Sequence, residues 1–208
     1  MTTRKILPSQ EGYDLYASKY DQRLSYLDSF EKDELVKLLP DIRDKRILDI
    51  GSGTGRIIQI LKRKTSSAGA HFTAVDISTE MLNIAKKKIP DIDIVHSDMT
   101  DLNLEDDSFD IVIAAFVIVH IHSKDLTKAF DEVARVLKPG GTFVLTNINQ
   151  RKAPKLKLNK KEELIIESHY HIPDHVIKAL EKSFFKIEKE IFIEEDKTWI
   201  NQIIKAII

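Results

Sequence analysis

The sequence predicts an α/β fold built on a doubly wound sheet, which is mostly parallel, ends in an antiparallel C-terminal strand pair and has an N-terminal helical cap. Three observations predict it. A short apolar run at 46–50 breaks into a turn with glycine at every second position, 51–55, and apolar residues at helical spacing follow. From there to residue 148, strand-like runs alternate with amphipathic helical segments, which indicates parallel strands joined by right-handed crossovers. Two closing apolar runs, 184–193 and 198–208, predict the antiparallel pair.

The individual elements follow in chain order. Apolar residues at i, i+3 and i+4 predict two helices within 9–39, and Pro40 stops the second. The expected strands of the main series are 46–50, 71–75, 93–96, 109–115 and 142–148. The expected helices of that series are 55–64, a helix capped by Ser78 that ends before Pro90, 123–137 and 173–182. Residues 138–141, which contain Pro139 and two glycines, predict a turn.

Composition excludes several classes of protein. Lys and Arg number 32 and Asp and Glu 33, so a formal net charge of −1 offers no support for a nucleic-acid partner. Without cysteine, the chain has no disulfide, thiolate metal ligand or cysteine nucleophile. Residues 1–8 lack the apolar region of a secretory signal, and the longest apolar run, 111–119, is too short to span a bilayer as a helix. We therefore expect a single cytoplasmic domain.

Glycine or polar residues follow four of the predicted strands, at the turn 51–55, at Asp76, at Asp98 and along 115–120. Because ligands of parallel sheets bind outside the carboxyl ends of the strands, these positions should meet at one ligand-binding edge. Glycine lets a ligand lie against bare backbone, and the N–H groups of the next helix suit an anionic ligand group. Arg56 stands where a dinucleotide fingerprint has its third glycine, and no Gly-Lys-Ser/Thr follows. The turn therefore predicts a site for one end of a nucleoside cofactor.

Two acids are placed to contact such a nucleoside. Asp76 can accept hydrogen bonds from both ribose hydroxyls, and Asp98 can accept one from an exocyclic amine. Met99 offers apolar contact to the base. Both acids also have a purely structural interpretation, because acids after strands often contact the start of the next helix or simply end the strand.

Five segments together resemble class I S-adenosylmethionine-dependent methyltransferases, of the small-molecule group ("type 11") that includes the ubiquinone/menaquinone-biosynthesis type. The segments are ILDIGSGTG at 47–55, AVDIS at 74–78, SDM at 97–99, SFDIV at 108–112 and VLKPGGTF at 136–143. They keep the family's order and spacing, and the resemblance extends from about Tyr13 to the C-terminus. It implies a Rossmann-like fold and S-adenosyl-L-methionine as the cofactor.

The resemblance also implies which residues hold the cofactor and how the chain is organised. The implied cofactor-binding residues are Tyr13, Tyr20, Asp49, Gly51, Gly53, Gly55, Asp76, Ile77, Asp98, Met99 and Ala115. The two tyrosines would belong to a lid, although their spacing alone also fits an amphipathic helix packed on the core. The implied single domain, 1–208, has a helical cap at 9–39, a cofactor-binding core at 46–148, a substrate-side loop at 149–171 and a helix with C-terminal strands at 172–208.

The implied reaction moves a methyl group from a sulfonium to a nucleophile, and a base is needed where that nucleophile carries a proton. His120 is the catalytic candidate, because it lies just beyond the fourth strand and neutral imidazole accepts a proton near pH 7. The alternative is a structural histidine at a helix start, and His122 is the weaker candidate. We predict no metal site, because His169, His171 and His175 lack the usual spacing of metal ligands.

The leading hypothesis is therefore an enzyme that methylates a small-molecule acceptor. Residues 115–117, Ala-Phe-Val, lack the Asn/Asp-Pro-Pro-aromatic motif of amino-group methyltransferases that act on DNA and some proteins. The lysine-rich stretch 151–161 would recruit an anionic acceptor, unless it is only a solvated loop. The alternatives are a protein- or peptide-directed methyltransferase, a non-catalytic partner that keeps the cofactor and, formally, a dehydrogenase. The sequence leaves the acceptor atom and the oligomeric state open.

Overall fold

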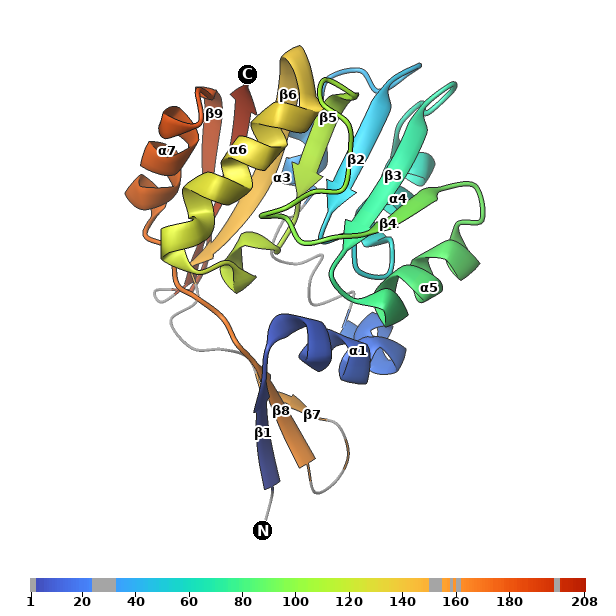
Figure 1. Cartoon of the computed structure of the whole chain (residues 1–208), viewed down its shortest axis with the longest axis vertical. Helices are drawn as coiled ribbons and strands as arrows, with labels where there is room; N and C mark the ends of the chain where they lie inside the picture. The colour runs from blue at the N-terminus through green and yellow to red at the C-terminus, as the bar shows by residue number, and fades with distance from the viewer. Residues whose placement is uncertain (1–2, 24–32, 150–154, 158, 160–161, 197–198) are drawn as a thin grey trace.

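The computed structural model describes residues 3–23, 33–149, 155–157, 159, 162–196 and 199–208. Its central element is a seven-stranded sheet with the order β4-β3-β2-β5-β6-β10-β9 (Figure 1). The strands are β2 (Arg46–Ile50), β3 (His71–Asp76), β4 (Asp93–His96), β5 (Phe109–Ala114), β6 (Leu137–Asn149), β9 (Lys186–Asp196) and β10 (Trp199–Ile207). The strands from β4 to β6 in this order pair in parallel, whereas β10 pairs antiparallel with β6 and β9. The predicted sheet, with its antiparallel C-terminal pair, is confirmed.

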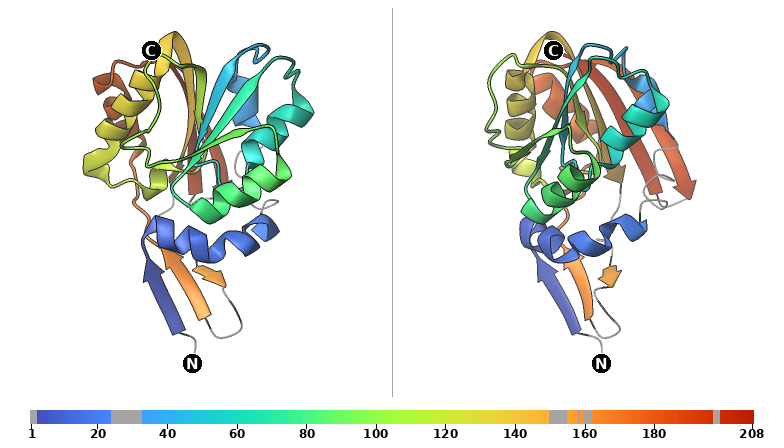
Figure 2. Two further views of the ribbon diagram at one scale, coloured as in Figure 1. Left: turned by 45° about the vertical axis from the view of Figure 1, so that its right-hand side comes forward. Right: turned by 90° about the vertical axis from the view of Figure 1, so that its right-hand side faces the viewer.

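Helices cover both faces of this sheet, as a doubly wound fold requires (Figure 2). One apolar cluster includes residues of α3 (Glu34–Leu38), α4 (Arg56–Lys64) and α5 (Thr79–Lys88), and a second includes residues of α6 (Leu126–Val136) and α7 (Pro173–Lys182). The two clusters lie on opposite faces because successive strand residues point to opposite sides. Ser78 caps α5, as predicted, by accepting a hydrogen bond from the Met81 N–H at 3.2 Å.

Two element starts differ from the sequence prediction. The expected turn at 138–141 lies within β6, because Leu137 already pairs with Phe109 before the register shifts. The Gly140 N–H still donates to the Ile208 carbonyl at 3.1 Å, so this irregular stretch stays hydrogen-bonded at the sheet. The helix expected at 123–137 begins as a 3₁₀ turn, η3 (Ser123–Asp125), and becomes α-helical in α6.

The segment predicted as a helical cap contains α1 (Ser9–Tyr20), the 3₁₀ turn η1 (Asp21–Arg23) and α3, of which α3 packs on a face of the main sheet. Residues 24–32, which fall within the range predicted to form the two N-terminal helices, lie outside the described residues. Within the described ranges, no helix combines the length and the apolarity needed to cross a lipid bilayer.

A second, three-stranded sheet lies on the far side of α1 from the main sheet (Figure 1). Its order is β1-β8-β7, with β1 (Thr3–Leu7), β7 (Lys155–Lys157) and β8 (Glu162–Ile166). The loop expected over 149–171 is therefore wrong at 155–157 and 162–166. These segments form strands because Leu156, Leu164 and Ile166 point inward and pack with Tyr16 of α1 in an apolar cluster of their own.

Candidate functional site

A cavity lies at the carboxyl ends of β2, β3 and β5, with α1 as its cover. The empty space within it, the open mouth included, is about 690 Å³. All predicted site residues except Asp49 and Gly55 line it. Asp49 is buried within β2, and Gly55 precedes α4 and faces Ile89. The cavity walls also include Ser9, Ile50, Met81, Ser97, Phe116, Val117 and Ile121.

The glycine turn brings bare backbone to this cavity. Gly51 and Gly53 have φ angles of 64° and 55°, in the left-handed region that favours glycine. A Cβ built on Gly51 would lie 2.6 Å from Val117, and one on Gly53 would lie 3.7 Å from the Tyr20 ring. Tyr20 therefore packs over the turn, and a larger residue at position 53 would take up the space between turn and cover.

Asp76, at the end of β3, is held by backbone on both sides. Its Oδ2 accepts the Gly53 N–H at 2.8 Å and its Oδ1 accepts the Ser78 N–H at 2.9 Å. Burial raises the pKa of Asp76 to about 6, against the lowering effect of these hydrogen bonds. Each oxygen has a second lone pair, so both can still accept a hydrogen bond from a ligand hydroxyl.

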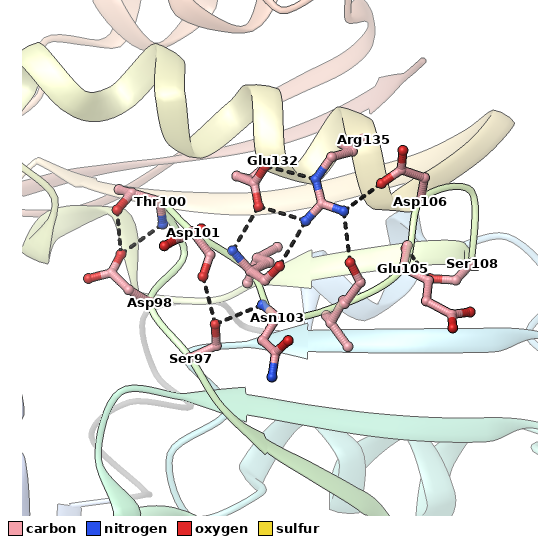
Figure 3. Close-up of polar contacts among 12 residues, drawn as sticks. Ser97, Asp98, Thr100, Asp101, Asn103, Glu105, Asp106, Ser108, Glu132 and Arg135 are labelled. Atoms are coloured by element: carbon pink, nitrogen blue, oxygen red, sulfur yellow. Dashed lines mark hydrogen bonds and ion pairs between the residues drawn. The ribbon is translucent and has the colours of Figure 1, made fainter.

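The loop that carries Asp98 and Met99 is held by side chains of α6, which sequence reasoning missed (Figure 3). Glu132 Oε2 accepts the Leu102 N–H at 2.7 Å, and Arg135 donates to the carbonyls of Leu102 and Leu104 at 2.8 and 2.7 Å. Arg135 also pairs with Glu132 and, at 2.6 Å, with Asp106. Within the loop, Ser97 Oγ donates to the Asp101 carbonyl at 2.8 Å. This network fixes the loop against α6 and so sets the position of Asp98 at the cavity.

We expect Arg135→Ala to lower the free energy of unfolding by about 1 to 3 kcal/mol. The reason is that the Leu102 and Leu104 carbonyls and the Glu132 carboxylate lose their charged partner. A ligand of the cavity should also bind about three- to tenfold more weakly, since Asp98 loses its support. Denaturant unfolding and calorimetry measure the two effects. Asp131→Ala, on the same helix but exposed, is the control. Unchanged ligand affinity together with lost stability would limit the network to a role in folding.

His120 contacts both helix α1, which covers the cavity, and the segment that follows β8. Its Nε2 lies 2.7 Å from the Tyr13 hydroxyl, and its Nδ1 lies 2.8 Å from the Glu167 carbonyl oxygen. A carbonyl only accepts, so the neutral ring carries its proton on Nδ1, and the Nε2 lone pair accepts the Tyr13 O–H. Burial lowers the pKa of His120 and keeps the imidazole neutral at pH 7. The ring is thus oriented with its basic nitrogen toward the cavity.

The segment 167–171, which leads from β8 to α7, clamps the 3₁₀ turn η2 (Ile118–His120). Besides the Glu167 contact, the His169 N–H donates to the Val119 carbonyl at 2.7 Å and His171 Nε2 donates to the Ile118 carbonyl at 2.8 Å. Burial lowers the pKa of His171. Sequence reasoning missed these positioning contacts, because a main-chain partner leaves no side-chain signal.

The remaining histidines lie outside the cavity wall. The rings of His122 and His169 are 4.9 Å apart, and His122 Nδ1 accepts the Lys124 N–H. Among the described residues, no group of three or more histidines and acids is arranged to hold a metal ion.

Comparison with known proteins identifies the family. A family model described as a methyltransferase domain matches residues 47–141. A demethylmenaquinone methyltransferase from Clavibacter sepedonicus is 33% identical over 150 residues, which cover 68% of this chain and 58% of that relative. The chain belongs to the class I S-adenosylmethionine-dependent methyltransferases.

Two further similarities were found, one in sequence and one in fold alone. The ubiquinone/menaquinone biosynthesis C-methyltransferase UbiE of Rickettsia prowazekii is 36% identical over 134 residues, 61% of this chain and 53% of that protein. The crystal structure of an S-adenosylmethionine-dependent methyltransferase from Mesorhizobium loti superposes with a TM-score of 0.70 at 20% identity, covering 88% of this chain and 100% of the other, and shows the same fold. The chain spans a little over half the length of the two curated relatives.

The cavity has the chemistry that the family's cofactor, S-adenosylmethionine, requires. Asp76 offers acceptors for ribose hydroxyls, and Met99 and Ala115 offer apolar wall for a base. Among the described residues that line the cavity there are two acids but no lysine or arginine, which suits a positively charged sulfonium. The residues present therefore fit the group.

Proposed function

We propose that this chain catalyses methyl transfer from S-adenosylmethionine to a small-molecule acceptor. The observation that carries the proposal is that the glycine turn, Asp76, Asp98 and His120 line one cavity at the carboxyl edge of the sheet. A nucleoside site and a base oriented by two hydrogen bonds share that cavity, as a group-transfer reaction requires. The cytoplasmic location and the single-domain organisation remain predictions from the sequence.

In this proposal each wall has its own part of the cofactor to hold. Asp76 accepts the ribose hydroxyls, Asp98 and Met99 contact the base, and the backbone at Gly51 and Gly53 lies against the chain that carries the sulfur. Ile77 and Ala115 supply apolar contact to the adenosine, and Tyr20 closes over Gly53. Asp49 and Gly55 shape the turn from outside the cavity rather than touching the ligand.

His120 and Tyr13 would handle the acceptor's proton. When bound, S-adenosylmethionine would supply a methyl group on a positively charged sulfur, and the sulfur would leave as a neutral thioether. The acceptor hydroxyl donates to the Tyr13 oxygen, while the Tyr13 proton moves to His120 Nε2. The Glu167 carbonyl holds the Nδ1 proton and so favours the imidazolium that forms.

The apolar residues of the cavity wall favour an aromatic hydroxy compound as the acceptor. Phe116, Val117 and Ile121 line the same cavity as Tyr13. A flat apolar ring would pack against these side chains, and its hydroxyl would reach the Tyr13–His120 pair. The similar proteins from Clavibacter and Rickettsia are named for quinones, which share the flat ring of this class but carry ring carbonyls in place of the hydroxyl.

Transfer of labelled methyl groups in a cell lysate tests the proposed function. We expect label from methyl-tritiated cofactor to enter organic-extractable small molecules, because the cavity suits a compact apolar acceptor. Label in acid-precipitable material would favour the protein-directed alternative. Cofactor binding without transfer to any fraction would favour a non-catalytic partner.

An anionic acceptor remains a proposal that rests on the lysines after β6. Lys155 and Lys157 lie on β7 of the small sheet, and Lys160 lies outside the described residues. Replacing Lys155 and Lys157 with Ser should raise KM for an anionic acceptor, because two positive charges that attract it are lost. The dependence of KM on salt should flatten, because less attraction remains for salt to screen. Steady-state kinetics at two salt concentrations would show this, and an unchanged KM would remove the idea.

A further inference from the structure

The cap carries the same residue pair twice, Tyr13-Asp14 within α1 and Tyr20-Asp21 where α1 meets η1. The two pairs are about two helical turns apart, so equivalent members lie on the same side of the helix. Both tyrosines line the cavity. Both aspartates instead contact the core, and each does so beside a residue that forms the proposed cofactor site.

Asp14 contacts the start of α5, next to the proposed ribose carboxylate. Its Oδ1 accepts the Ser78 hydroxyl at 2.6 Å and the Glu80 N–H at 3.2 Å. Ser78 is fully buried, caps α5 and donates its own N–H to Asp76. Ser78 thus connects the cap, through Asp14, to Asp76.

Asp21 contacts the glycine turn from the other end of the cap. Its Oδ1 accepts the Thr54 hydroxyl at 2.6 Å, and its Oδ2 forms an ion pair with Lys88 in the last turn of α5. Thr54 is fully buried and directly follows Gly53, over which Tyr20 packs. Asp21 therefore gives the cap a second contact with the core, next to the backbone of Gly53 against which the cofactor would lie.

Helix α1 packs along α5 of the core, and it also has apolar support from the small sheet. Tyr16 packs with Leu156, Leu164 and Ile166 of the small sheet. Gly12 lets α1 lie close to β8, because a Cβ there would be 2.8 Å from Ile166. Helix α1 and the small sheet thus form one body. The contacts of Asp14 and Asp21 with the core are polar and only partly buried, so water can replace them at small cost.

We propose that Asp14 and Asp21 are positioning residues that fasten this body closed over the bound cofactor. This inference rests on the proposed function. When both contacts are made, Tyr20 covers the glycine turn and Tyr13 reaches His120. When both are broken, the body made of α1 and the small sheet moves away and the cofactor exchanges with solution. The two aspartates therefore set the lifetime of the cofactor complex.

The test measures release of tritium-labelled S-adenosylmethionine from the full chain after dilution into unlabelled cofactor. We expect Asp14→Ala and Asp21→Ala each to raise the dissociation rate constant about three- to tenfold, and the double variant to raise it further, with the association rate constant within about twofold of the unsubstituted chain. Unlike Asp14→Ala, Asp14→Asn should release the cofactor as slowly as the unsubstituted chain, because the amide oxygen still accepts hydrogen bonds from the Ser78 hydroxyl and the Glu80 N–H. Asp21→Asn should restore it only in part, because the ion pair with Lys88 is lost.

Glu11→Ala is the matched control, because Glu11 is an exposed acid on the same helix, and its release rate should not change. The asparagine variants keep the shape of the side chain, so they remain informative if an alanine variant unfolds. Release rates within twofold of the unsubstituted chain in Asp14→Ala and Asp21→Ala would overturn the positioning role and leave the proposed function intact. Failure of the unsubstituted chain to bind labelled cofactor would overturn both.

Discussion

Replacement of His120 with alanine is expected to lower kcat by about 10²- to 10⁴-fold, the usual contribution of a positioned general base. The imidazole of His120 is neutral, and two hydrogen bonds fix its orientation with the basic Nε2 toward Tyr13. Affinity for the cofactor should change little, because His120 contacts Tyr13 and Glu167 rather than the glycine turn. Steady-state kinetics with the acceptor found by methyl labelling, together with calorimetry of cofactor binding, measure both quantities.

Two variants and the pH profile sharpen this test. Tyr13→Phe keeps the ring but removes the hydroxyl that donates to His120, so it should also lower kcat. His122→Ala, two residues away and outside the cavity wall, should leave kcat unchanged.

Because burial lowers the pKa of His120, kcat should be flat near pH 7 and fall only as pH drops below the ordinary imidazole value. A kcat for His120→Ala within twofold of the unsubstituted chain would favour the structural alternative.

The main sheet could be predicted because its signals are local. Strand β2 ends where the apolar run meets the glycine turn, and α5 begins where Ser78 accepts the Met81 N–H. The site then followed from topology, since parallel strands end at one edge. That rule alone brings Asp76 and Asp98 together, although their roles toward a ligand remain predictions.

The small sheet could not be predicted in this way. Strands β1 and β8 pair across about three quarters of the chain, since Thr3 lies opposite Glu162, and β7 contains only Lys155–Lys157. Such short segments carry little periodicity of their own, and lysines dominate the composition around β7. Their strand state depends on packing of Leu156 and Leu164 against Tyr16, which only the folded chain supplies.

The supporting residues of the site were missed for a different reason. Glu132 and Arg135 are spaced like an ordinary surface ion pair on a helix, and nothing in the sequence indicates that they hold the loop of Asp98. Glu167 acts through its main-chain carbonyl, so its side chain gives no signal. Sequence reasoning thus found many of the residues that face the cavity and missed those that hold them in place.

Replacement of Asp76 with alanine is expected to weaken binding of S-adenosylhomocysteine by about 2 kcal/mol, roughly 30-fold, because the proposed ribose hydroxyls lose a buried acceptor. Calorimetry measures this loss. Asp93→Ala is the control, because Asp93 is exposed at the start of β4.

The pH dependence of the same binding gives an independent check. Burial raises the pKa of Asp76 to about 6, and the ligand hydroxyls need the ionised form as their acceptor. Protonation therefore competes with binding, so affinity should be constant above about pH 7 and fall up to tenfold per unit below about pH 6. The Asp76→Ala variant has no such group, and its weaker affinity should stay flat over the same range. If the unsubstituted chain is also flat, or if the variant keeps full affinity, the ribose is held elsewhere; the hydrogen bonds of Asp76 to Gly53 and Ser78 would then serve only to join the turn to α5.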